Sequence, residues 1–311
     1  VPQGSNLGPL LFLLFINDLL EVLSCECLAY ADDIKIFGRI TEVEDSLKLQ
    51  HDMDMLFDWC LKNNMSLNVA KCNVLTFSRK RNSIKFEYKI GQVVLNKETV
   101  IKDLGVWIDS KLSFRQHYDY IVSKCNRTMG FLMRSIRPFK EPNTIIILYK
   151  ALIRSVLEYC SVVWSPYYDQ HRNRIESVQR RFVRHLSTKV GLRRKLQTYE
   201  KRLEHFKMDS LENRRYLHSY AVLFKIVNSL WDTSELLHQI KLTFGRYRNQ
   251  KLFHVPLLTY NVSYNDPLYR VCRNYNTIHN EVDIFHQSLT AFLRDIYAKQ
   301  IMNQPSNKCQ P

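Results

Sequence analysis

Two adjacent aspartates, Asp32 and Asp33, lie between two apolar runs of strand type, residues 28–31 and 34–37. We expect a tight β-hairpin with both carboxylates at its tip, because Asp tolerates the backbone angles of a two-residue turn. Two carboxylates this close repel each other, and Mg²⁺ removes the conflict by binding their oxygens together with nucleotide phosphates. The pair therefore predicts a Mg²⁺ site of the kind used in phosphoryl transfer, with Mn²⁺ as a substitute. The alternative is an ordinary solvated turn, in which Asp-Asp pairs are common.

Three further blocks accompany the Tyr30-Ala31-Asp32-Asp33 stretch. They are VPQGSNLGPLLFLLFIND at residues 1–18, Leu67-Asn68-Val69-Ala70-Lys71, and Leu104-Gly105-Val106-Trp107-Ile108-Asp109. In this order and at these spacings, the blocks resemble the reverse transcriptases of non-LTR (LINE-type) retrotransposons. The resemblance covers the C-terminal part of the polymerase domain only and weakens beyond residue 215. It implies RNA-directed DNA polymerase activity by Mg²⁺-dependent nucleotidyl transfer, with an RNA template, a DNA primer and dNTPs as partners.

The resemblance also implies roles for single residues near the aspartates. Asp32 and Asp33 would bind the metal and act in catalysis, and Lys71 would lie near the triphosphate and protonate the leaving pyrophosphate. The residues that would contact the incoming nucleotide or the template are Gln3, Gly4 and Tyr30. Taken alone, Gly4 reads as a turn residue and Lys71 as a surface charge.

The sequence pattern predicts an α+β fold. The resemblance implies that residues 1–110 form a partial polymerase palm of antiparallel hairpins and packed helices, with Trp107 in the primer grip; taken alone, Trp107 would more commonly lie in the core. Residues 111–190 would form a helical thumb, and residues 191–311 a basic, mostly helical C-terminal extension. We further expect one buried helix over residues 10–16, helices beginning at capping boxes Thr41/Glu44 and Ser113/Gln116, a helix opened by Pro142, and a last helix over residues 281–302.

Positive charge is concentrated away from the aspartate pair. The chain of 311 residues has a net charge of +15, but residues 1–58 carry −8 and the remainder +23. Residues 172–215 alone hold 14 Lys or Arg against 5 acidic residues. This bias favours contact with the phosphates of a template–primer duplex over a merely solvated helix face. The candidate contacts are Arg180, Arg181, Arg184, Arg193, Arg194 and Lys195.

The sequence gives little support for a disulfide-rich, zinc-binding or membrane-spanning protein. The eight cysteines form no CxxC pair and no zinc-knuckle spacing, so we expect reduced thiols. The longest apolar run, residues 10–16, is too short for a membrane span, and no signal peptide precedes it, which predicts an intracellular protein of nucleus and cytoplasm. The resemblance implies that the fingers and the first catalytic aspartate strand lie upstream in the same polyprotein. We therefore expect this segment alone to be inactive; the alternative is a non-catalytic nucleic-acid-binding remnant.

Overall fold

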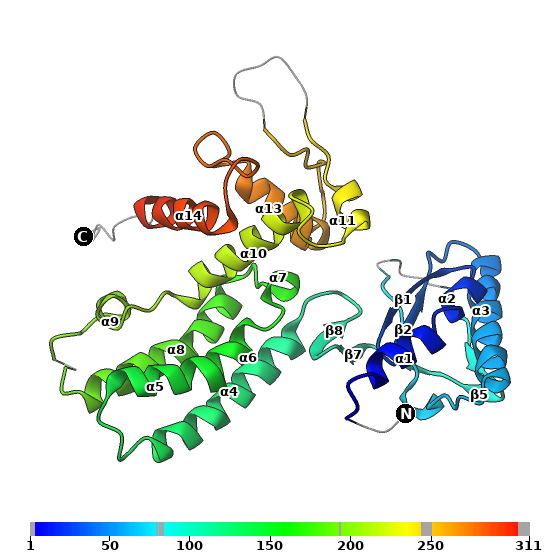
Figure 1. Cartoon of the computed structure of the whole chain (residues 1–311), viewed down its shortest axis with the longest axis horizontal. Coiled ribbons are helices and arrows are strands. Elements are labelled where there is room, and N and C mark those ends of the chain that lie inside the picture. The colour runs from blue at the N-terminus through cyan, green and yellow to red at the C-terminus, as the bar shows by residue number, and fades with distance from the viewer. Residues whose placement is uncertain (1–3, 79, 81–83, 193, 244–250, 304–311) are drawn as a thin grey trace. The chain divides into compact units, whose positions relative to one another are not determined.

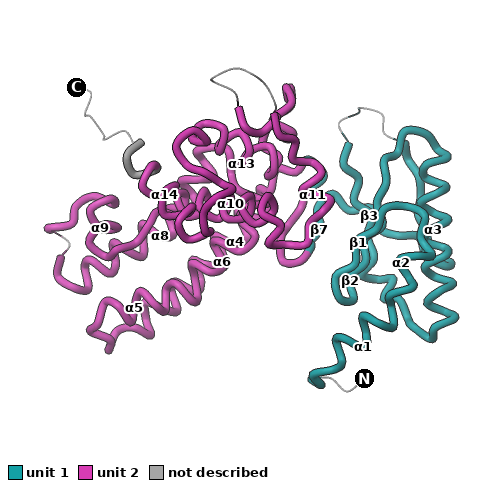
Figure 2. Tube along the Cα trace, turned by 45° about the horizontal axis from the view of Figure 1, so that its top comes forward, with its two compact units in different colours: residues 1–103, 109–111 teal, residues 104–108, 112–311 magenta. Residues whose placement is uncertain are grey.

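The chain divides into two compact units. The computed structural model describes residues 4–78, 80, 84–192, 194–243 and 251–303 (Figure 1). Unit 1 comprises residues 1–103 and 109–111, and unit 2 comprises residues 104–108 and 112–311 (Figure 2). The described chain as a whole consists of helices with small two-stranded sheets, which confirms the α+β class. The division into palm, thumb and extension stays a prediction. In the described part, no helix is long and apolar enough to cross a membrane.

Unit 1 packs three helices on one side of a hairpin. Its elements begin with α1 (Gly8–Phe15), α2 (Leu19–Val22), β1 (Glu26–Tyr30), β2 (Asp33–Phe37) and α3 (Val43–Lys62). The core is formed by Ile16, Leu19, Leu56, Trp59 and Cys60. Asp52 of α3 accepts hydrogen bonds from Ser24 and from the Cys25 N–H, at the start of β1. Burial opposes ionisation of Asp52, but these hydrogen bonds outweigh it and lower its pKa.

Two expectations for unit 1 are wrong. Helix α1 has no buried residue, and five of its apolar side chains are exposed, because the described chain packs against only one side of it: Leu10, Leu11, Leu13, Leu14 and Phe15. Helix α3 does not use Thr41 and Glu44 as its capping box. The box is formed one residue later by Glu42 and Asp45, where the Asp45 carboxylate accepts the Glu42 N–H.

The rest of unit 1 consists of short pieces. A 3₁₀ turn, η1 (Val69–Lys71), leads into β3 (Asn73–Leu75), which pairs in parallel with β6 (Asn96–Glu98). Strands β4 (Lys89–Ile90) and β5 (Val93–Val94) form a hairpin around Gly91, followed later by β7 (Val100–Asp103). Gly91 has φ of 56°, and a Cβ there would lie 3.0 Å from the Phe57 ring, so both its backbone and its packing require glycine.

The described residues of unit 2 form one β-strand followed by helices. They contain two hydrophobic clusters. The first cluster covers residues 106–211 and the second residues 220–296. Its elements are β8 (Val106–Asp109), α4 (Arg115–Ser135), α5 (Pro142–Tyr149), the π-helical turn η2 (Lys150–Arg154), α6 (Ser155–Glu158), α7 (Ser161–Trp164), α8 (Asp169–Lys189), α9 (Tyr199–His205), α10 (Leu211–Val227), α11 (Ser234–Gln239), α12 (Asn261–Tyr264), α13 (Pro267–Tyr275) and α14 (Leu289–Asn303).

Helix starts in unit 2 depart from the predicted ones. Helix α4 begins after Phe114, which has φ of 55°, so Ser113 is not its N-cap. The last helix starts at Leu289, because residues 281–288 form turns that Asp283 stabilises by accepting the Phe285 N–H. By contrast, Pro142 opens α5 as predicted.

Buried polar side chains of α8 connect three helices. Gln179 Nε2 donates to the Tyr199 hydroxyl and to the Asp209 carbonyl, at 2.9 Å each. Glu176 accepts a hydrogen bond from Tyr199 and another, at 3.0 Å, from the Leu211 N–H in the first turn of α10. A carboxylate at a helix N-terminus is stabilising, so Glu176 fixes the start of α10.

His117 holds β8 against α4. The side chain is only 2% exposed and packs on Trp164, with ring centroids 5.0 Å apart. Its Nδ1 lies 3.3 Å from the Trp107 N–H and accepts that hydrogen bond, which requires the neutral imidazole with the proton on Nε2. Burial lowers the pKa of His117 to about 4.

This environment predicts a pH-dependent stability of unit 2. Below pH 6.5 the unfolded chain binds a proton at His117, whereas the folded chain does not until about pH 4, so stability falls as the pH drops through this window. The shift corresponds to about 3 kcal/mol at pH 4. In His117→Gln, whose amide oxygen can accept the same N–H, the free energy of unfolding should fall less between pH 7 and pH 4. Urea unfolding at both pH values measures the difference; an equal fall in both proteins would contradict it.

Candidate active site and nucleic-acid interface

The aspartate pair lies on the predicted hairpin, but the residues that form its turn differ from the predicted ones. Strands β1 and β2 are antiparallel, and Tyr30 pairs with Asp33. The two loop residues are therefore Ala31 and Asp32, and Ala31 takes the positive φ of 53°. The expectation that Asp-Asp forms the turn itself is wrong by one residue: Asp33 is already the first residue of β2.

The pairing register assigns side chains to two faces of the hairpin. Ile34 and Ile36 pack against the core of unit 1, and their neighbours along β2 point to the opposite face because side chains alternate. Tyr30 and Asp33 lie directly opposite each other on that outer face. It is open to solvent, since Tyr30 is 67% exposed and Leu28 is 53% exposed.

Both carboxylates are exposed, and neither takes part in a side-chain hydrogen bond or ion pair with a described residue. The nearest cation along the strand, Lys35, is occupied by Asp103 of β7, with 2.7 Å between Nζ and Oδ2. The pair is thus available to an outside cation. In kind the two oxygen-donor groups fit Mg²⁺, but among the described residues no third His, Cys, Asp or Glu joins them as a cluster.

The other residues predicted for nucleotide contact are scattered. Gly4 lies in a turn with φ of 89°, and a side chain there would meet nothing within 4 Å. Lys71 is exposed in the 3₁₀ turn η1 and, in the described residues, forms no ion pair with Asp32 or Asp33. Gln3 lies outside the described residues.

Trp107 belongs to unit 2, on strand β8. Its ring is half-buried and meets Tyr120 edge-on, with centroids 6.2 Å apart. The turn before it is held by a residue that the sequence analysis missed. The Tyr159 hydroxyl donates to the Leu104 carbonyl at 2.9 Å, and a Cβ on Gly105 would lie 3.2 Å from the Tyr159 ring. No local sequence signal indicates this contact, because 55 residues separate the partners.

A basic face runs along two parallel helices of unit 2. Arg181 Nη1 of α8 donates to Asn126 Oδ1 of α4 at 3.2 Å, and Lys189 Nζ donates to the Arg137 carbonyl at 3.0 Å. We define the α4–α8 basic face by its exposed cations. They are Lys124, Arg127, Arg134, Arg137 and Lys140 from α4 and its C-terminal end, and Arg180, Arg181 and Arg184 from α8.

The three predicted arginines of α8 point in different directions. Arg180 lies over the Tyr199 ring, 5.2 Å from its centroid, whereas Arg181 turns toward α4. Arg184 lies one turn further along the exposed side. Arg194 and Lys195 are exposed in the turn after α8, and Arg193 lies outside the described residues.

Part of the basic stretch 172–215 serves the fold instead. Arg172 pairs with Glu212 at 2.8 Å, Arg174 pairs with Asp119, and Arg214 forms a two-point ion pair with Glu158. Arg215 is 2% exposed. The charge that unit 2 presents to a partner is therefore smaller than the sequence count, and it comes from α4 as well as α8.

Comparison with known proteins shows which proteins the N-terminal part of the chain resembles. Residues 1–108 match the family model described as reverse transcriptase (RNA-dependent DNA polymerase). The chain is 30% identical over 201 residues to the RNA-directed DNA polymerase from mobile element jockey of Drosophila funebris, covering 60% of this chain and 22% of that protein. It is 28% identical over 192 residues to the probable RNA-directed DNA polymerase from transposon X-element of Drosophila melanogaster, covering 59% and 21%.

The match to a third relative covers a larger share of that protein. The chain is 26% identical over 194 residues to the retrovirus-related Pol polyprotein from type-1 retrotransposable element R1 of Nasonia vitripennis, covering 58% of this chain and 57% of that protein. The chain spans about a fifth of the length of the jockey and X-element relatives. No solved structure gives a significant match. Residues 1–108 are thus similar to reverse transcriptases, and the relatives named here are RNA-directed DNA polymerases and a Pol polyprotein of mobile elements.

Proposed function

We propose that the chain is a segment of an RNA-directed DNA polymerase of a non-LTR retrotransposon. The observation that carries the proposal is the β1–β2 hairpin, inside a region that matches reverse transcriptases: it presents Asp32 and Asp33 to solvent, and no cation of the described residues pairs with them. RNA template, DNA primer and dNTPs are the proposed substrates. The residues assigned to nucleotide contact are Gln3, Gly4, Tyr30 and Lys71, with Trp107 assigned to the primer.

The metal proposed for this site is Mg²⁺, with Mn²⁺ as a substitute. Asp32 and Asp33 would hold it, and when bound it would activate the primer hydroxyl and neutralise developing phosphate charge. Two exposed carboxylates form a poor cage for an ion that gives up its water reluctantly, and the described residues add no third His, Cys, Asp or Glu to them. The hairpin therefore supplies one part of a site that needs substrate phosphates and further carboxylates.

The uncovered apolar surface of unit 1 supports the need for further protein. Five side chains of α1 are exposed, as are Leu28 and Phe37 on the outer face of the hairpin. Apolar surface of this kind is typical of an interaction site. We infer that other segments of the polymerase cover it and complete the active site.

Primer extension on an RNA template with Mg²⁺ tests the proposal. The 311-residue chain should extend a primer poorly or not at all, because a loose catalytic geometry costs about a hundredfold per ångström. A longer product of the same reading frame should extend it, and Asp32→Asn should abolish that extension. Asp58→Asn, the same change at an exposed aspartate of α3, serves as the control. Extension by the 311-residue chain that Asp32→Asn removes would overturn the view that the site is incomplete.

Metal binding can be measured separately from activity. We expect Mn²⁺, followed by water proton relaxation, to bind the chain weakly and to lose this binding in Asp32→Ala. The physical reason is the small number of protein ligands at the hairpin. Tight binding that depends on Asp32 would mean that another carboxylate completes the site; binding unaffected by Asp32→Ala would remove the hairpin from the metal site.

The α4–α8 basic face is the proposed duplex-binding surface. Lys and Arg that contact phosphates release counterions, so affinity for an RNA–DNA duplex should fall steeply with salt. The alternative function, a non-catalytic nucleic-acid binder, is favoured by this same face and predicts duplex binding without extension by any longer product.

Replacing Arg180, Arg181 and Arg184 with Gln should flatten the salt dependence of duplex binding. The slope of log affinity against log salt should decrease by up to about 3, since each phosphate contact contributes roughly 0.9. Fluorescence anisotropy at several salt concentrations measures it. A triple variant of exposed lysines in unit 1, Lys48, Lys62 and Lys97 to Gln, controls for net charge. If both triple variants keep the original slope, α8 is not on the binding face.

A further inference from the structure

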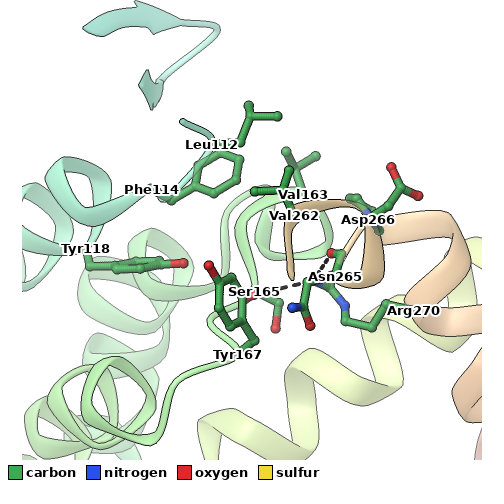
Figure 3. A pocket seen from close by; sticks show the side chains of 11 residues that line it. Leu112, Phe114, Tyr118, Val163, Ser165, Tyr167, Val262, Asn265, Asp266 and Arg270 are labelled. Atoms are coloured by element: carbon green, nitrogen blue, oxygen red, sulfur yellow. Dashed lines mark hydrogen bonds between the residues drawn. The ribbon is translucent and has the colours of Figure 1, made fainter. Parts of the chain in front are cut away.

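Unit 2 contains a pocket that the proposed polymerase chemistry does not use. It has a volume of about 170 Å³ and lies where α4, α7 and the α12–α13 segment meet (Figure 3). Phe114, Tyr118 and Tyr167 line one side, and Arg270 approaches from the other. Apolar cavities of roughly 150 Å³ hold a single benzene ring, so this pocket is the size of one flat ring and not of a drug-sized ligand.

The pocket has a cation that lacks a carboxylate partner in the described part of the chain. The Arg270 guanidinium donates to the carbonyls of Val162 at 2.6 Å, Asn265 at 3.2 Å and Ser165 at 3.4 Å. The one acid in the lining, Asp266, uses its carboxylate to cap α13 by accepting the Leu268 N–H. Burial lowers the pKa of Arg270, which reflects the cost of holding this charge away from water.

An aromatic platform lies beside the pocket. The Arg273 guanidinium stacks on the Tyr264 ring, 3.6 Å from its centroid, and donates to the Tyr264 carbonyl at 2.8 Å. Tyr264 is 47% exposed and directly precedes Asn265 of the pocket lining. Aromatic rings and guanidinium planes of this kind stack unpaired bases in proteins that bind single strands.

We propose that the pocket takes one unpaired base of a single-stranded nucleic acid, and that the Tyr264–Arg273 pair stacks a neighbouring base. A nucleobase combines a flat ring of the right size with edge oxygens and nitrogens that accept from a guanidinium, on a chain of phosphates that complements the two arginines. An apolar protein side chain would fill the ring-sized space but would bring no negative charge to Arg270 and Arg273. A base inside a duplex cannot enter, because it is paired and stacked.

The inference rests on the proposed function, under which the unpaired strand is the RNA template. It gives residues 260–275 a role distinct from that of the α4–α8 basic face: the face binds duplex, and the pocket binds single strand. The two activities can therefore be lost separately.

Binding of the full chain to labelled 12-residue oligonucleotides tests the inference. The probes are a uridine 12-mer, a thymidine 12-mer and a blunt RNA–DNA duplex, measured by fluorescence anisotropy. Val262→Phe fills the pocket and Tyr264→Ala removes the platform, so each should weaken single-strand binding about tenfold and leave duplex binding within twofold. Phe285→Ala removes an exposed aromatic residue outside the pocket and should bind like the unchanged chain.

Photocrosslinking gives a second readout that does not depend on substitutions. A uridine 12-mer with one 4-thiouridine should crosslink to peptides that contain Phe114, Tyr167 or Tyr264. The uridine and thymidine probes separate a site for RNA from a site for any single strand, and both results support an unpaired base. Unchanged single-strand affinity in the folded Val262→Phe and Tyr264→Ala variants, or crosslinks only elsewhere, would overturn the inference. If the unchanged chain did not bind the duplex at all, this result would instead contradict the proposed function.

Discussion

The pairing register of β1 and β2 determines what unit 1 can do. Because side chains alternate along a strand, the packing of Ile34 and Ile36 on the core sends Asp33 and Lys35 to the outer face. A slip of one residue would reverse every assignment and bury the carboxylate. The ion pair between Lys35 and Asp103 reinforces the register and keeps the cation away from Asp33. The availability of the two aspartates is thus a consequence of hydrophobic packing on the opposite face.

The electrostatics of unit 2 depend on which arginines are already paired. Sequence counts treat the 14 basic residues of 172–215 alike. In the fold, Arg172, Arg174 and Arg214 neutralise acids that come from other helices. Half-buried pairs of this kind are screened less than those in open water. The long-range field therefore comes from exposed cations, and α4 with its C-terminal end contributes five of the eight that define the α4–α8 basic face.

Local patterns predicted the hairpin, the α+β class and the start of α5 at Pro142, since each follows from neighbouring residues. Local patterns failed where a contact between residues far apart in the sequence determines the structure. The N-cap of α4 is Phe114 and not the predicted Ser113, and the Phe114 side chain lines the pocket. The apolar run 10–16 predicted a buried helix, but burial also requires a neighbour on each side. The Tyr159–Leu104 bond and the Arg270 pocket join residues far apart in sequence, which no local motif encodes.

A buried carboxylate helps to position α10, the helix that connects the two clusters of unit 2. Glu176 of α8 accepts the first-turn N–H of α10, and α10 continues into the second cluster through Leu223 and Phe224. That cluster contains α13, whose Arg270 reaches back to the carbonyls of α7. Burying a carboxylate is costly, and an apolar residue could pack as well but could not fix where α10 begins. Together with the Ser210 side chain that caps the helix, Glu176 therefore helps to set where α10 begins.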